Sequence, residues 1–492
     1  MNQFIGNALL GARGAGRREF MRRALWAGVA LQAGALAAPR QTNAQVAGTP
    51  AAPGQSADYV IRGGHVLSMD SALGDFPVGD VHVRNGSIVA VGRDIAAAGA
   101  DVVDARDMIV MPGFIDTHSH LWNAFLRGSV RGDDPLLGYF PTTNRAAPLC
   151  TPEDAYNSVR LAIAEGLLSG VTSVNNFSHN TRSKEHADAE IRAALETGVR
   201  SRFSHGPGGR DGRINVQDIR RVKDEWGTRS PLLTLGVNLT LPAPAVLKAN
   251  GDSPFVDEVK FARELGLPIS LHFGNTANGL VSYIDGRGGL GPDFLLIHMQ
   301  GLTAEDRKLL VARKVKLSMS PAIEIPYSTV RNGYIQFAEL EELGAQLSLS
   351  IDASSASAST DFFTVMRALL WAHKQRSDTK LQLTPKRIVE LATIEGARAL
   401  GLDDRTGSLT PGKRADIILI RRNDPNIVPV FEPYNSLVYS GQPVNVDTVI
   451  VDGAVLVRSN KLTRLDIGQV VKASVASATR VAAEMAELLK PK

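Results

Sequence analysis

Residues 111–120 read Met-Pro-Gly-Phe-Ile-Asp-Thr-His-Ser-His, and this stretch decides the fold expected for the chain. A short apolar run ends here in polar residues, which is typical of a buried strand that carries functional side chains at its carboxyl end. His118 and His120 stand two positions apart, and residues i and i+2 of a strand point to the same side. Both imidazoles are therefore predicted to face one ion.

Seven further apolar runs follow along the chain. They end near Asn176, His205, Asn238, His272, His298, Ser320 and Asp352. Helical patterns such as 184–197 and 304–313 separate them. Strand–helix alternation of this length predicts an α/β fold in which residues 114–404 form a parallel (β/α)8 barrel. Because such barrels carry their chemistry at the carboxyl ends of the strands, the polar residues that end the runs are the candidates for function.

Two β-rich stretches flank the predicted barrel. Residues 58–113 contain short strands and the pair Asn85-Gly86, which is a strong hairpin signal. Residues 405–462 show a similar alternation. We expect the two stretches, from opposite ends of the chain, to form one small β-sandwich, and residues 463–492 to form a C-terminal helix.

The formal net charge of the 492 residues is +4, and it is concentrated at the N-terminus. Residues 1–45 hold six arginines and one glutamate, a net charge of +5, so the remainder carries −1. Arg17-Arg18, the following Phe20 and a weakly apolar stretch indicate a twin-arginine signal peptide. We therefore expect the twin-arginine machinery to export the protein to the periplasm or beyond. The near-neutral remainder argues against a nucleic-acid partner, and no stretch reaches the roughly 20 apolar residues of a membrane span.

The predicted site is built from histidine and carboxylate side chains. Cys150 is the only cysteine, which excludes an intramolecular disulfide framework and every cysteine-based zinc motif. Four histidines and one aspartate follow directly on apolar runs: His118, His120, His272, His298 and Asp352. Imidazole nitrogens with a carboxylate suit one divalent ion, Zn²⁺ first and Fe²⁺ or Co²⁺ as alternatives, with a position left for water.

The stretch 111–120, together with Gly412-Lys413-Arg414-Ala415-Asp416, resembles the amidohydrolase superfamily. The similarity is greatest to the branch of triazine hydrolases, cytosine-deaminase-like enzymes and phenylurea hydrolases, and it extends from Asp58 to about Leu462. The resemblance implies a metal site formed by four ligands: His118, His120, His272 and Asp352. It also implies that Asp352 accepts a proton from metal-bound water, that His298 polarises the substrate, and that the protein is a homo-oligomer.

The sequence departs from the superfamily's patterns at two places, and these departures bear on the number of metal ions and on the reaction expected. The fourth apolar run, residues 232–239, has no lysine or acid that could bridge a second ion, which favours a mononuclear site. Deaminases of this branch place a glutamate three residues after the fifth-strand histidine, where this chain has Asn275. An amide cannot shuttle protons, so ring deamination is disfavoured unless Glu324, after the seventh strand, replaces that glutamate. Glu324 is equally consistent with a surface loop.

Five side chains are candidates for substrate contacts: Asn275, His205, Glu324, Trp122 and His179. Asn275 can donate a hydrogen bond, and His205 ends the third strand. Trp122 follows the histidine pair, where it could form an apolar wall or pack in the core. His179 follows the second strand and could line the pocket.

The sequence therefore predicts a metal-dependent enzyme that hydrolyses a non-peptide C–N bond of a small molecule through a metal-activated water. Amides, ureas, carbamates and N-substituted heterocycles all fit. The alternative is an aminohydrolase that deaminates a purine, pterin or triazine-like ring. A third and less favoured hypothesis is a non-catalytic periplasmic binding protein, which the complete set of ligands argues against.

Overall fold

A computed structural model describes residues 58–488, apart from 132–133, 209–211, 243, 252, 274–278, 299, 332–334 and 358. The predicted signal peptide, residues 1–45, and the candidate Asn275 lie outside the described residues. Within the described part of the chain, no helix is both long enough and apolar enough to cross a membrane.

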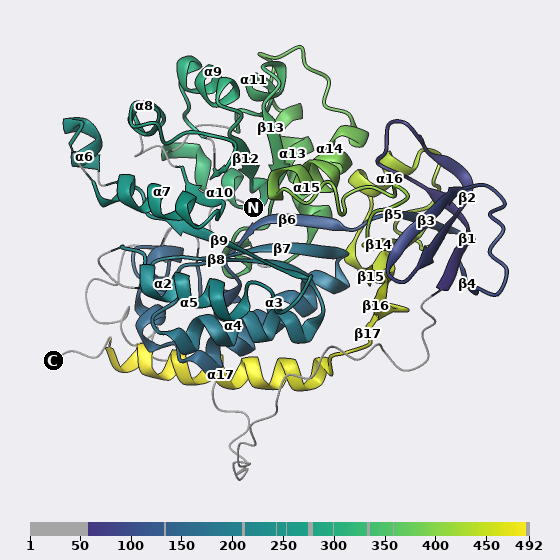
Figure 1. The fold of residues 1–492 in the computed structure, drawn as a ribbon, viewed down its shortest axis with the longest axis horizontal. Helices are drawn as coiled ribbons and strands as arrows, with labels where there is room; N and C mark the ends of the chain where they lie inside the picture. The colour runs from purple at the N-terminus through teal and green to yellow at the C-terminus, as the bar shows by residue number, and fades with distance from the viewer. Residues whose placement is uncertain are drawn as a thin grey trace, which may run out of the picture. The chain divides into compact units, whose positions relative to one another are not determined.

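Eight parallel strands form a barrel at the centre of the fold (Figure 1). Each strand pairs with the next one along the chain. Their bounds are β6 (Phe114–Ser119), β7 (Val171–Ser178), β8 (Arg200–His205), β9 (Leu233–Leu239), β10 (Ile269–His272), β11 (Phe294–Ile297), β12 (Lys316–Met319) and β13 (Gln346–Leu349). A parallel bridge between Ser119 and Asp352 joins the carboxyl end of β6 to the segment after β13. The predicted (β/α)8 barrel is confirmed.

Helices connect the barrel strands and cover their outer faces (Figure 1). They are η1 (Leu121–Leu126), α2 (Tyr139–Ala146), η2 (Ala147–Leu149), α3 (Pro152–Leu168), α4 (Lys184–Thr197), α5 (Val216–Trp226), α6 (Pro244–Ala249), α7 (Pro254–Glu264), α8 (Leu280–Asp285), α9 (Ala304–Ala312), α10 (Pro321–Arg331), α11 (Phe337–Glu342), α12 (Ser354–Ser357), α13 (Phe362–Lys374), α14 (Pro385–Ala392) and α15 (Ile394–Leu400). Local sequence sets several of their ends. Thr151 and Asp154 form a capping box at the start of α3, and Gly198, at a φ of 81°, ends α4.

A separate nine-stranded sheet combines segments from both ends of the described chain (Figure 1). Its strands are β1 (Asp58–Val66), β2 (Phe76–Arg84), β3 (Ser87–Gly92), β4 (Asp101–Asp104), β5 (Met108–Pro112), β14 (Ile417–Arg421), β15 (Val446–Val451), β16 (Ala454–Arg458) and β17 (Lys461–Leu462). The two segments meet where β5 pairs with β14. Two short helices, α16 (Pro433–Tyr439) and η4 (Pro443–Asn445), lie between β14 and β15 in the chain. Apolar side chains from both segments, such as Ile61, Val81 and Ile417, pack in one buried cluster.

The stretch 111–120 links this sheet directly to the barrel. Strand β5 ends at Pro112 and β6 begins at Phe114, so Gly113 alone separates them. A Cβ at Gly113 would lie 2.1 Å from Cγ2 of Thr172, which explains the glycine by close approach. The amide of Gly113 donates to the carbonyl of Asp416 at 3.1 Å. The two motifs that carry the family resemblance are therefore in direct contact.

The C-terminal helix α17 (Ile467–Leu488) packs along α3 and reaches η1 (Figure 1). Asn157 of α3 donates to the Ser477 hydroxyl at 3.2 Å. Val481 and Met485 pack in one cluster with Trp122 of η1. Because η1 starts directly after His120, the last helix supports the segment that follows the histidine pair.

Candidate metal centre

Five candidate residues meet at the carboxyl ends of the barrel strands. His118 lies in β6, and His120 directly follows that strand. His272 ends β10, His298 directly follows β11, and Asp352 lies three residues beyond β13. Parallel strands place their carboxyl ends at one rim of the barrel, so residues more than 200 positions apart converge.

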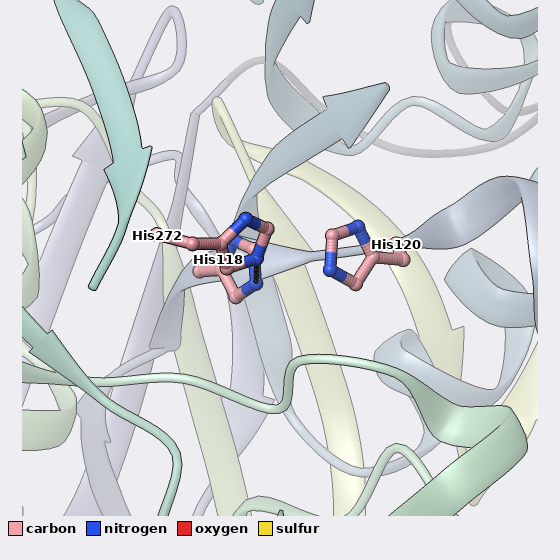
Figure 2. Close-up of side chains that lie close together, drawn as sticks. All are labelled: His118, His120 and His272. Carbon is pink, nitrogen blue, oxygen red and sulfur yellow. Dashed lines mark hydrogen bonds between the residues drawn. The ribbon is translucent and has the colours of Figure 1, made fainter. Parts of the chain in front are cut away.

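The convergence brings nitrogen and oxygen atoms to metal-ligand spacing. The ligand atoms of His118, His120 and His272 lie within 4.8 Å of one another, and so do those of His118, His298 and Asp352. Nε2 of His118 lies 3.3 Å from Nε2 of His272, and Figure 2 shows these two rings close together with His120 beside them. Oδ1 of Asp352 lies 3.3 Å from Nε2 of His118 and 3.2 Å from Nε2 of His120.

The protonation of these imidazoles suits a cation. Burial, and then the neighbouring His120, lower the pKa of His118 to about 3. Burial and the other histidines also hold the pKa of His272 well below its usual range. Nδ1 of His120 lies 3.1 Å from the carbonyl of Phe177, so it donates there and leaves the Nε2 lone pair free. Neutral nitrogens this close repel each other unless a proton or a cation lies between them, so the donor set fits a divalent ion.

Asp352 and His298 form the other side of the site. Burial opposes ionisation of Asp352, but the charge of His298 and the proximity of His118 and His120 outweigh it and hold the pKa of Asp352 well below its usual range. Nε2 of His298 lies 3.4 Å from Oδ2 of Asp352. Burial lowers the pKa of His298, but Asp352 and Glu324 more than compensate, so that pKa is raised. The carboxylate thus faces the histidine pair with one oxygen and His298 with the other.

The backbone at both residues is unusual. His298 and Asp352 have φ values of 65° and 70°, in the left-handed region that is rare outside glycine. The amide of Asp352 donates to the carbonyl of His118 at 2.8 Å, and its own carbonyl accepts from the amide of His120 at 2.9 Å. Backbone strain of this kind persists where the surrounding structure imposes it and is concentrated at functional sites.

Asp116 is a residue of the site whose role the sequence did not reveal. Its side chain is buried, and it accepts hydrogen bonds from the hydroxyl of Ser119, from the amide of His118 at 3.3 Å and from the amide of Ile351 at 3.0 Å. Burial raises the pKa of Asp116 to about 7, against these hydrogen bonds. Asp116 therefore ties the strand of His118 to the segment of Asp352. The only feature of the sequence that pointed to this role is the position of Asp116, two residues before the histidine pair.

A second feature that the sequence reading missed is a polar layer inside the barrel. The Thr117 hydroxyl lies 2.7 Å from that of Ser318 and 3.1 Å from that of Ser348. Asn175 donates to the carbonyl of Thr117 at 2.9 Å and accepts from Ser204 at 2.7 Å. Thr117 directly precedes His118, so this polar layer is continuous with the strand that carries the histidine pair. In the sequence, this layer could have been inferred from the serine, threonine and asparagine residues at alternate positions of the strands.

The other sequence-predicted residues divide into two groups. His179 and Trp122 lie beside the histidines: the rings of His120 and His179 are 4.4 Å apart, and the Trp122 indole donates to Nδ1 of His179 at 3.4 Å. Glu324 is buried against His298. His205 faces the opposite way, and its Nε2 lies 2.8 Å from Asp218 on α5. The substrate contact expected of His205 therefore has no support in this geometry.

The family of the chain follows from its similarity to known proteins. A sequence profile described as the Amidohydrolase family matches residues 109–456, more than half of the chain. The chain belongs to the amidohydrolase family. This confirms the resemblance inferred from residues 111–120 and 412–416, both of which the match includes.

Relatives cover nearly all of the described chain. The sequence is 27% identical over 441 residues to a 5'-deoxyadenosine deaminase of Methanosarcina mazei, covering 87% of this chain and 99% of that one. It is 28% identical over 431 residues to a 5-methylthioadenosine/S-adenosylhomocysteine deaminase of Desulfitobacterium hafniense, covering 83% and 95%.

Solved structures share the fold. An adenosine deaminase from Xanthomonas campestris with bound zinc has a TM-score of 0.76 at 22% identity, covering 87% of this chain and 99% of that one. An atrazine chlorohydrolase from Arthrobacter aurescens complexed with zinc has a TM-score of 0.75 at 20% identity, covering 85% and 100%. The chain thus shares its fold with two proteins whose names indicate different substrates.

Proposed function

We propose that this protein is a metal-dependent hydrolase that cleaves a non-peptide C–N bond of a small molecule. The observation that carries the proposal is the convergence of His118, His120, His272 and Asp352 at the barrel rim of an amidohydrolase. Neutral imidazoles and an ionised carboxylate are the protonation states that ligands require. A complete ligand set beside His298 also argues against a non-catalytic binding protein.

Each residue of the site has a separate role in the proposed hydrolysis. His118, His120, His272 and Asp352 would hold the divalent ion, which when bound lowers the pKa of water to about 7 and so supplies the nucleophile. Asp352 can accept the proton of that water and deliver it to the leaving nitrogen. His298 lies on the far side of the carboxylate, and its pKa is raised, so its protonated ring can donate a hydrogen bond from Nε2 to the oxygen of the substrate as negative charge develops.

Zinc is the proposed ion. Three histidines with one carboxylate are typical ligands of zinc, and two structures that share this fold are described with bound zinc. A single ion is favoured because β9, the fourth barrel strand, contains neither a lysine nor an acidic residue that could bridge a second one.

Deamination of an adenosine-type ring is the second candidate. The names of the relatives favour it, since those with 27–28% identity are deaminases of adenosine derivatives. Asn275 disfavours deamination, because an amide cannot carry the proton that a glutamate at that position transfers. We therefore place amides, ureas, carbamates and N-substituted heterocycles first.

One experiment separates these possibilities. The metal-free protein is reconstituted with Zn²⁺ and assayed against both substrate panels, by release of amine or ammonia. We expect turnover of at least one open-chain amide, urea or carbamate, and loss of that turnover in His298→Ala with the zinc content retained. Fast deamination of 5'-deoxyadenosine by the native protein, with no open-chain turnover, would reverse the order of the two candidates. Failure to bind zinc would refute both.

We also propose that the protein is exported by the twin-arginine pathway. Support comes from Arg17-Arg18, Phe20 and the apolar stretch that follows. The test is cell fractionation of the full chain in a bacterial host that has the pathway. We expect periplasmic protein from the native sequence and retention in the cytoplasm after Arg17→Lys with Arg18→Lys. Equal export of both forms would contradict the proposal.

A further inference from the structure

The geometry points to Glu324 as a positioning residue that sets the orientation and the tautomer of His298. This role differs from the substrate contact expected of Glu324. Its kinetic consequence rests on the proposed hydrolase function, whereas its structural consequence is measurable without any substrate.

Glu324 is held within the protein. Its side chain is 2% exposed, against 19% for that of His298. Oε1 accepts a hydrogen bond from the amide of Ser320 at 2.9 Å and lies 3.1 Å from Nδ1 of His298. The carbonyl of Glu324 also accepts from Nε2 of Gln300 at 3.3 Å. With its carboxylate anchored in this way, Glu324 is directed at His298.

The position follows from two neighbouring strands. Helix α10 begins at Pro321, immediately after β12, and its first turn carries Glu324. His298 follows β11, which pairs with β12, and its amide donates to the carbonyl of Ser318 at 3.1 Å. The carboxylate and the imidazole are therefore brought together by strand pairing, although 26 positions separate them.

The chemical consequence concerns one proton. Oε1 of Glu324 accepts from the amide of Ser320 and so acts as an acceptor, which means that the Nδ1 atom of His298 facing the same oxygen carries the hydrogen. Nε2 is then the nitrogen that faces Asp352, at 3.4 Å from Oδ2. An imidazole without this partner is free to rotate about its second side-chain torsion, which has a broad distribution, and to exchange tautomers. Glu324 thus selects which nitrogen of His298 is presented to the reaction.

Kinetics of two variants test whether geometry or charge matters. Glu324→Ala removes the acceptor, and we expect kcat to fall about 10–100-fold with KM and zinc content nearly unchanged. Glu324→Gln retains an oxygen that can accept from His298 and Ser320, so it should restore kcat to within a few-fold of the native value. The matched control is Glu190→Gln, another buried glutamate, whose partners Asn176 and Ser178 lie outside the histidine cluster. Equal loss in both Glu324 variants, or native kcat in Glu324→Ala, would overturn the proposal.

The tautomer is read directly in the metal-free protein. Long-range ¹H–¹⁵N spectra of histidine-labelled protein are recorded at a pH where the ring is neutral, and His298 is assigned from its absence in His298→Asn. We expect the Nδ1–H tautomer in the native protein and in Glu324→Gln, and a mixture in Glu324→Ala. An Nε2–H tautomer in the native protein would overturn the proposal even if Glu324→Ala fails to fold. Since no substrate is needed, this result stands even if the hydrolase assay finds no activity.

Discussion

Replacement of Asp116 by alanine tests how the two halves of the metal site are held together. Oδ1 of Asp116 accepts from the amides of His118 and Ile351, and Oδ2 accepts from the hydroxyl of Ser119. The first amide belongs to a proposed ligand, and the second immediately precedes Asp352. Alanine removes all three acceptors, whereas asparagine can keep an oxygen for both amides and turn its NH₂ group toward the hydroxyl.

The expected size of the effect follows from these contacts. Two buried amide donors left without partners cost about 1–3 kcal/mol each, or about 2–6 kcal/mol together. That loss is a large share of the roughly 5–15 kcal/mol by which a folded protein is stable. Loss of a group that orients metal ligands also lowers metal affinity by about 10–100-fold. Asp116→Asn should cost less than about 1.5 kcal/mol, since its amide group can reproduce the hydrogen bonds.

The assay combines urea denaturation of the metal-free protein with zinc affinity measured by chelator competition. The control is Asp416→Ala, which removes the carboxylate that buried Arg200 contacts at 2.7 Å and 3.0 Å and leaves Arg200 with Asp452 at 3.2 Å. Breaking this ion pair should cost about 3–5 kcal/mol and leave zinc affinity unchanged, because the pair contacts no proposed ligand. Native zinc affinity in Asp116→Ala, or an Asp116→Asn variant as damaged as the alanine variant, would refute the reasoning.

Three further predictions concern pH, metal and the last helix. Burial raises the pKa of Glu190 from 4.5 to about 7, so the folded state favours the protonated acid; the resulting stability is complete below pH 4.5 and is lost as the pH rises through 7. The free energy of unfolding of the native protein relative to Glu190→Gln should thus fall by about 3 kcal/mol over this range, and a flat difference would contradict it. Zinc at 100 times its Kd should raise the free energy of unfolding by about 2.7 kcal/mol, with a much smaller rise in His272→Ala; calorimetry of both proteins checks this. Met485→Ala should cost about 2 kcal/mol or more in urea denaturation, because Met485 packs with Trp122, whereas Val475→Ala on the exposed face of α17 should cost under about 0.5 kcal/mol.

Much of the site could be predicted from the sequence because its residues lie at, or just after, the carboxyl ends of strands. His118, His272, His298 and Asp352 all follow short apolar runs, and the carboxyl ends of parallel strands share one rim. His205 fits the same description, yet it turns away toward Asp218. Its neighbour Ser204 points inward to Asn175 instead. Successive residues of a strand face opposite sides, and chain order does not say which of two adjacent residues faces inward.

The sequence by itself determined the architecture and the chemical class of the site. Eight apolar runs that alternate with helical patterns specify the barrel, and the histidine pair in residues 111–120 specifies the family, because both signals are local and periodic. Only the tertiary structure decided which side chains orient the ligands. Asp116 reaches Ile351, and Glu324 reaches His298, through strands paired across the barrel. Such contacts depend on register and on backbone angles in the turns after the strands, which no local pattern encodes.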